Sequence, residues 1–113
     1  MICVGDEVQQ LSAAIQGIAT PDLAKIIAVY EPVWAISTSP NARPATPEDA
    51  LTARKEFQKV LPSTVTILYG GSVNPDNIES FLIQGKMDGA LVGGASLDPQ
   101  KFAAMIEKVA AIG

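Results

Sequence analysis

The segment VTILYGGSVN, residues 65–74, decides the fold because a mostly apolar run leads directly into a Gly-Gly pair. Three further short apolar runs occupy residues 2–4, 26–30 and 89–92. None of the four runs alternates strictly between apolar and polar residues. Near-continuous apolar strands are typical of parallel sheets in which both faces are buried. We therefore expect a parallel sheet of four strands.

A helical pattern follows each run, at residues 8–18, 46–61, 74–85 and 98–109. The second pattern opens with Thr46 as a capping hydroxyl, followed by a proline and two acids in the first turn. Asp98 is expected to cap the fourth helix in a similar way. Strands alternating with helices predict an α/β chain, residues 1–113, whose crossovers are right-handed.

Composition excludes several classes of protein. The chain has 113 residues, of which 48% are hydrophobic, and a net charge of −4, so neither nucleic acid nor an anionic membrane is the expected partner. No apolar stretch approaches the roughly 18 residues that a membrane span needs. A single cysteine and the absence of a signal-peptide pattern favour a cytoplasmic location. Because the chain has no histidine, it cannot supply a histidine base, acid or metal ligand.

Gly-Gly pairs follow two successive strands, at Gly70-Gly71 and Gly93-Gly94. Glycine allows a positive φ and a close approach of backbone to ligand, and a helix that follows directs free N–H groups at an anion. The two pairs therefore predict a phosphate site built from backbone amides. The alternative is that these glycines serve only tight turns.

Glu31 ends the second apolar run and precedes a proline. A part-buried carboxylate at the end of a parallel strand can act as a general base. The alternative is an acid that serves only a salt bridge or a helix dipole. The long segment 32–45 that follows is typical of a functional loop.

Four motifs together resemble the triosephosphate isomerase family: ICVG at 2–5, YEPVWAI at 30–36, ILYGGSV at 67–73 and DGALVGGASL at 88–97. They are similar to the fifth to eighth strands of that family's (βα)8 barrel and follow the same order. The resemblance implies the C-terminal half of a TIM barrel. It also implies interconversion of dihydroxyacetone phosphate and glyceraldehyde 3-phosphate in glycolysis and gluconeogenesis, with neither metal nor organic cofactor.

The resemblance assigns a role to each matching residue. Glu31 is the implied catalytic base, which moves a proton between two carbons of the triose. The implied phosphate ligands are Ser37, Ser72, Gly93 and Gly94, the glycines through their amides. Residues 32–46 correspond to the lid over the substrate, and the implied lid and hinge residues are Pro32, Val33, Trp34 and Tyr69. Tyr69 is expected to bond to the closed lid.

The chain departs from the family in three places. The family's N-terminal half, which supplies a lysine and a neutral histidine, has no counterpart in the sequence. The lid reads STSPNARP at 37–44, where the family usually has Gly-Thr-Gly-Lys, so it is longer and contains additional prolines. The segment 5–9 is shorter than in the family and looks like a deletion.

Three hypotheses follow. The chain is an enzyme half that needs a complementary N-terminal half, or a half-barrel in which two copies associate and bind phosphate without catalysis, or a truncated product without a role of its own. An open parallel sheet has two unpaired edges, which favours association with another chain. Cys3 and Phe102 are expected to pack in the core.

Overall fold

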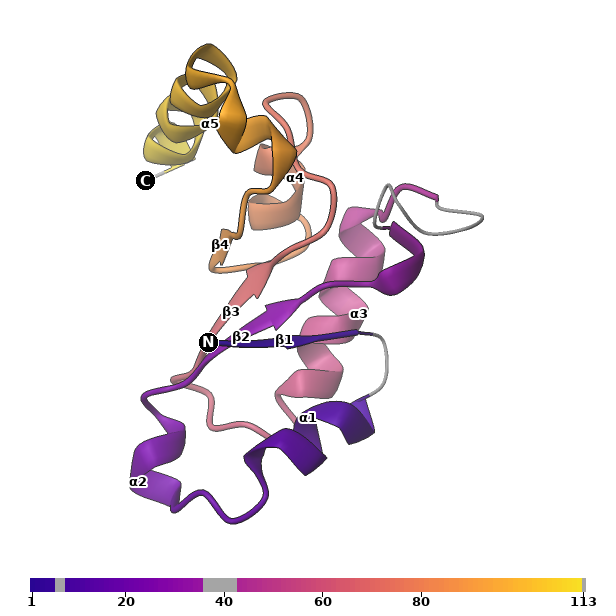
Figure 1. Ribbon diagram of the computed structural model, residues 1–113, viewed down its shortest axis with the longest axis vertical. Coiled ribbons are helices and arrows are strands. Elements are labelled where there is room, and N and C mark those ends of the chain that lie inside the picture. The colour runs from indigo at the N-terminus through magenta and orange to yellow at the C-terminus, as the bar shows by residue number, and fades with distance from the viewer. Residues whose placement is uncertain (6–7, 36–42, 113) are drawn as a thin grey trace.

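The structure, a computed structural model, describes residues 1–5, 8–35 and 43–112. Its centre is one parallel sheet in the order β1-β2-β3-β4 (Figure 1). The strands are β1 (Ile2–Val4), β2 (Ile27–Tyr30), β3 (Thr66–Tyr69) and β4 (Gly89–Ala90). The prediction of four parallel strands alternating with helices is confirmed. The arrangement is that of half a (βα)8 barrel.

In the described residues, the α-helices between and after the strands are α1 (Val8–Ile15), α2 (Thr20–Leu23), α3 (Pro47–Phe57), α4 (Ile78–Ile83) and α5 (Pro99–Ile112). Two 3₁₀ turns, η1 (Val33–Ala35) and η2 (Gly94–Leu97), follow β2 and β4. In the described part of the chain, no helix is long and apolar enough to cross a membrane.

α4 begins later than the sequence pattern predicts. The side-chain oxygen of Asn74 accepts hydrogen bonds from the amides of Asp76 and Asn77, at 2.8 and 3.1 Å. This local turn competes with helix, so the helix starts at Ile78. The short helix α2 was not predicted from the sequence.

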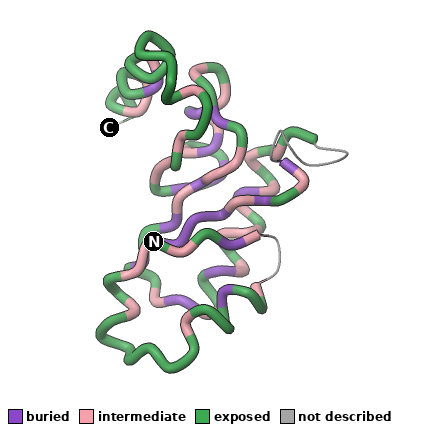
Figure 2. Tube along the Cα trace, viewed as in Figure 1, coloured by how far each residue is buried: buried purple, intermediate pink, exposed green. Residues whose placement is uncertain are grey.

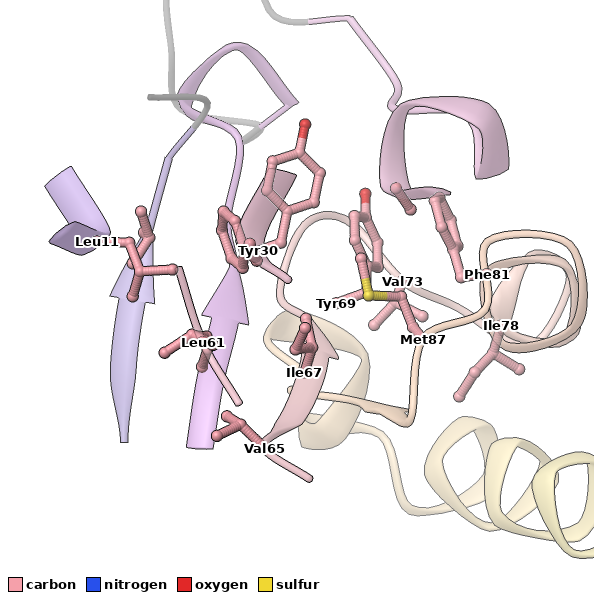
Figure 3. Packing of buried hydrophobic residues seen from close by; sticks show 14 of the residues in the cluster. Leu11, Tyr30, Leu61, Val65, Ile67, Tyr69, Val73, Ile78, Phe81 and Met87 are labelled. Carbon is pink, nitrogen blue, oxygen red and sulfur yellow. The ribbon is translucent and has the colours of Figure 1, made fainter. Parts of the chain in front are cut away.

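One face of the sheet packs against the helices, and we call it the helix-covered face. The ring of Tyr69 stacks on Phe81 of α4 with centroids 3.8 Å apart, and Tyr30 meets Phe57 of α3 edge-on at 6.1 Å. Leu11 of α1 extends this core (Figure 3). Figure 3 also shows that the hydroxyls of Tyr30 and Tyr69 both point toward the carboxyl ends of the strands. The core therefore leads up to the edge of the sheet where the candidate site lies.

The opposite face, which we call the open face, is only partly buried. Cys3 is exposed there, so the prediction that it packs in the core is wrong. The physical reason is alternation along the strand, since Val4 points to the helix-covered face and Cys3 to the other. Within the described residues, helices cover one face of this sheet, whereas the sequence pattern predicted burial of both.

α5 is mostly exposed, as Figure 2 shows. Met105 is buried against the core, but Phe102 is 38% exposed, so the prediction that Phe102 is a core residue is wrong. The helix packs mainly on α4 and on η2. Asp98 caps it as predicted, because its carboxylate accepts hydrogen bonds from the amides of Gln100 and Lys101, at 3.0 and 3.3 Å.

Candidate active site

The segments that follow β2, β3 and β4 line one cavity of about 340 Å³ at the carboxyl edge of the sheet. We call it the site cavity. Its lining consists of Glu31, Gly70, Gly71, Ser72, Val73, Asn74, Gly93, Gly94 and Ala95. The structure thus brings the predicted base together with three of the four predicted phosphate ligands. The fourth, Ser37, lies outside the described residues.

Among the described residues that line the site cavity, Glu31 alone is ionisable. Its side chain is half-buried, and its backbone amide donates a hydrogen bond to the carbonyl of Val4 at 2.8 Å. That bond continues the pairing of β1 with β2 by one residue and fixes the backbone from which the carboxylate projects. Position and partial burial suit a general base.

Cys3 lies beside this carboxylate, which the sequence interpretation did not anticipate. Desolvation, the negative charge of Glu31 and a hydrogen bond to Glu31 raise the pKa of the Cys3 thiol. The register explains the contact, because Cys3 pairs with Val29, and Glu31 follows Val29 by two residues on the same face. A predicted parallel register between the first two strands would have revealed in advance that Cys3 and Glu31 lie side by side.

The two Gly-Gly pairs differ in their surroundings. A Cβ atom at Gly70 would lie 2.5 Å from Val29 Cγ1, and one at Gly71 would overlap the hydroxyl of Tyr69. At Gly93 and Gly94, by contrast, a Cβ atom would meet nothing within 4 Å. The first pair is thus required by close packing, whereas packing does not explain the second.

The expected positive φ is not found at either pair. Among the described glycines, only Gly17 has one, at 84°. Close approach therefore explains the first pair, and the space beside Gly93 and Gly94 stays open to a ligand.

η2 begins at the second pair and closes by hydrogen bonds from the amide and hydroxyl of Ser96 to the carbonyl of Gly93, at 2.9 and 2.6 Å. Within the described residues, the amides of Gly93, Gly94 and Ala95 have no acceptor. Unpaired amides at the start of a helical turn suit an anion.

Ser72 connects the site cavity to η1. Its hydroxyl donates to the carbonyl of Ala35 at 3.0 Å, and its own carbonyl accepts a hydrogen bond from Asn77 Nδ2 at 3.1 Å. The predicted phosphate ligand therefore also holds the turn that follows Glu31.

The predicted hinge residues lie in and beside η1. Pro32 is buried, Val33 is exposed, and the half-buried ring of Trp34 lies under the guanidinium of Arg43, 3.8 Å from the ring centroid. Of the lid predicted over residues 32–46, the part from 36 to 42 lies outside the described residues.

Tyr69 is fully buried, and its hydroxyl has no hydrogen-bond partner among the described residues. Burial, reinforced by the charge of Asp49, raises the pKa of Tyr69 to about 12. The predicted bond from this hydroxyl to the lid stays a prediction.

The described residues contain no cluster of three or more histidine, cysteine, aspartate or glutamate side chains that could hold a metal ion. The site cavity instead offers one carboxylate and a row of backbone amides. Such a set suits proton transfer on a small anionic substrate.

A parallel βα sheet with a carboxylate and glycine-rich turns at its carboxyl edge is the arrangement found in (βα)8-barrel proteins. The family model for triosephosphate isomerase matches residues 3–109. The chain belongs to the triosephosphate isomerase family.

Individual relatives agree. The triosephosphate isomerase of Mycoplasmoides gallisepticum is 45% identical over 103 residues, which cover 87% of this chain and 41% of the relative. That of Solibacter usitatus is 44% identical over 102 residues, which cover 86% of this chain and 41% of the relative. That of Caldanaerobacter subterraneus subsp. tengcongensis is 36% identical over 124 aligned positions, which cover 94% of this chain and 50% of the relative. The chain thus spans about half, or less, of the length of these relatives.

Proposed function

We propose that this chain carries the C-terminal half of a triosephosphate isomerase active site, with Glu31 as the base. The carboxylate takes a proton from the substrate carbon beside the carbonyl and returns it to the neighbouring carbon. Dihydroxyacetone phosphate and glyceraldehyde 3-phosphate are interconverted through an enediol. The amides of Gly93 and Gly94, with Ser72, hold the phosphate.

One observation carries this proposal, namely that a single cavity contains both a carboxylate and unpaired amides. A triose phosphate has an anionic end and a reacting end a few bonds apart, so it needs these two features in one pocket. Glu31 supplies the one ionisable side chain among the described residues of the lining, which supports its role as the base. Backbone amides recognise phosphate without a lysine, although more weakly than with one.

The proposed site is incomplete in this chain. The sequence has no histidine, and none of the described residues that line the site cavity is a lysine. We propose that a complementary N-terminal half supplies both, so that the isolated chain is inactive. The single cysteine favours a cytoplasmic location for the assembled enzyme.

Reconstitution tests the proposal. The chain is mixed with the N-terminal part of a full-length relative, and isomerisation is followed in both directions by coupled assays. We expect the pair to be active and each half alone to be inactive. A folded, stoichiometric complex without activity would overturn the proposal.

Substitution of Glu31 identifies the base in the reconstituted enzyme. Glu31→Gln should lower kcat by roughly 10²- to 10⁴-fold because it removes the proton acceptor. Glu31→Asp should lower kcat less, since it displaces the carboxylate by one methylene. Far-UV circular dichroism should be unchanged in both variants. Full activity of Glu31→Gln would remove Glu31 from this role.

A second candidate is a self-associated half-barrel that binds phosphate without catalysis. The open edges of β1 and β4 favour it, because each has no second strand beside it in the described part of the chain. Light scattering and phosphate titration of the chain alone distinguish the two candidates. A dimer that binds phosphate and gains no activity from an N-terminal half would favour the second.

A further inference from the structure

Arg43 makes two contacts with Trp34, although eight residues separate them in the sequence. Its guanidinium lies 3.8 Å from the centroid of the Trp34 ring, and its backbone amide donates to the Trp34 carbonyl at 2.8 Å. Both distances are within the range of favourable contacts. One residue therefore holds the side chain and the backbone of Trp34 together.

The same guanidinium reaches the start of α3. Its Nη1 atom lies 3.5 Å from Asp49 Oδ2 and 3.4 Å from the carbonyl of Pro44. The Asp49 oxygen is itself fixed, because it accepts the backbone amide of Thr46 at 2.9 Å. Arg43 thus bridges Trp34 and the first turn of a helix whose far end packs on β2 through Phe57 and Tyr30.

η1 is held on its other side by the loop after β3. Ser72 Oγ donates to the Ala35 carbonyl at 3.0 Å, and the Ala35 amide donates to the carbonyl of Pro32 at 3.0 Å. Glu31 directly precedes Pro32. The position of the Glu31 carboxylate therefore depends on a turn held by Ser72 on one side and by Arg43 on the other.

An exposed ion pair alone would not fix this turn, since such pairs contribute little in water. At Arg43, however, the guanidinium stacks on the Trp34 ring and reaches an anchored carboxylate, and the backbone amide of the same residue bonds to Trp34. Lysine has no planar group that could stack on the ring and face Asp49 at once. Arg43 does not line the site cavity, so a role as a phosphate ligand is not supported.

We propose that Arg43 is a positioning residue, which fixes η1 against the first turn of α3 and thereby sets the carboxylate of Glu31. The effect on catalysis depends on the proposed function. The effect on Trp34 does not, so the two are tested separately.

Trp34 is the only tryptophan of the chain, so its fluorescence reports this contact directly. Arg43→Gln should shift the emission of Trp34 and increase acrylamide quenching roughly twofold, because the guanidinium no longer covers one ring face. Arg43→Lys should resemble Arg43→Gln. Arg54→Gln is the matched control, since Arg54 pairs with Asp88 instead, and it should leave the emission unchanged. Unchanged emission and quenching of folded Arg43→Gln would overturn the proposal.

Kinetics of the reconstituted enzyme test the second half of the proposal. Arg43→Gln should lower kcat roughly tenfold and change KM less than about twofold, because misplacing a base affects the chemical step more than binding. An equal fall in kcat with Arg54→Gln would indicate general destabilisation and overturn the positioning role. If the wild-type complex is inactive, the proposed function fails while the fluorescence result still stands.

Discussion

Glycine occupies four positions around the site cavity, and the reasons differ between the two pairs. Gly70 and Gly71 are required because Val29 and the Tyr69 hydroxyl leave no room for a Cβ atom. At Gly93 and Gly94 that room exists. The two interpretations of the glycines, tight packing and phosphate binding, can therefore be separated by substitution.

Gly94→Ala should leave the free energy of unfolding within about 0.5 kcal/mol of wild type, because the new methyl group meets no protein atom. It should weaken binding of inorganic phosphate, since the methyl group adds bulk beside the unpaired amides. Urea unfolding and calorimetric titration measure the two effects.

Gly85→Ala is the matched control, because a Cβ atom there would lie 2.5 Å from the Phe81 carbonyl oxygen, and it should be destabilising. Phosphate binding by Gly94→Ala equal to that of wild type would support the turn-only interpretation of the second pair.

Tyr69 has a buried hydroxyl that gains no hydrogen bond from the described residues. Tyr69→Phe should therefore be as stable as wild type or slightly more stable, because an unsatisfied buried group carries a desolvation cost. Urea unfolding of both proteins at neutral pH measures this. A loss above about 1 kcal/mol would mean that the hydroxyl has a partner.

The raised pKa of Tyr69 also leads us to expect a loss of stability at high pH. Its pKa is raised from an ordinary 10.0 to about 12 in the folded chain, so the unfolded chain loses this proton first. The free energy of unfolding should consequently fall as pH rises from 10 towards 12. Tyr69→Phe should show a smaller fall over that range, and equal slopes for both proteins would contradict the assignment.

α3 begins with a complete capping box. The Thr46 hydroxyl accepts the Asp49 amide at 3.2 Å, and the Asp49 carboxylate accepts the Thr46 amide at 2.9 Å. The sequence predicted this start, because a hydroxyl, a proline and two acids in succession permit few other structures. It did not predict that Arg43 would pair with the Asp49 carboxylate, since that contact depends on the path of the chain before α3.

Thr46→Ala should reduce the free energy of unfolding by about 1 kcal/mol, the usual cost of losing a cap. Thr52→Ala, at an exposed position within α3, is the control and should have little effect. Chemical unfolding followed by circular dichroism gives both values. Equal stability of the two variants would show that the box contributes nothing.

The same box predicts a dependence on acid pH. Desolvation alone would raise the pKa of Asp49, but hydrogen bonds from Thr46 and the charge of Arg43 outweigh it and lower the pKa below 3.8. A carboxyl group whose pKa is lower in the folded chain than in the unfolded chain stabilises the fold at pH values above the unfolded-state pKa. That stabilisation is lost as the pH falls through the folded-state pKa. Asp49→Asn should therefore flatten the acid limb of the stability profile, and an unchanged limb would contradict this.

Alternating strands and helices were predictable because each element has its own apolar pattern and its own end signals. The site was predictable as far as it follows strand ends, which is how Glu31 and the Gly-Gly pairs came to be expected together, whereas the role of Ser72 was implied by the family resemblance. The sequence could not show which face of a strand stays open. The wrong predictions for Cys3 and Phe102 share this cause, since both are apolar positions on surfaces that this chain does not cover.

The molecule leaves apolar surface uncovered in more than one place. Besides the open face, α4, β4 and α5 line a mostly apolar groove of about 370 Å³ that includes Leu82, Phe102 and Ile106. Exposed apolar surface of this kind marks an interaction site in a soluble protein. It supports both proposed arrangements, since either a complementary half or a second copy would cover it.

We expect the isolated chain to have a solution mass above its 11.8 kDa at micromolar concentration. Light scattering after size exclusion measures this. Ile106→Glu should lower the mass because it places a charge in the groove, whereas Glu107→Gln on the neighbouring exposed position should not. A monomer at all concentrations would show that this surface needs a different partner.

The single direction of all four strands restricts how copies can associate. The free edge of β4 can continue a parallel sheet with its helices on the same face only by pairing with the free edge of β1 on another copy. Such head-to-tail pairing uses two different surfaces, so it ends only when the last copy meets the first. If the curvature of the sheet lets two copies close, the product is an eight-stranded ring. If it does not, the same contact adds copies without limit and produces fibres.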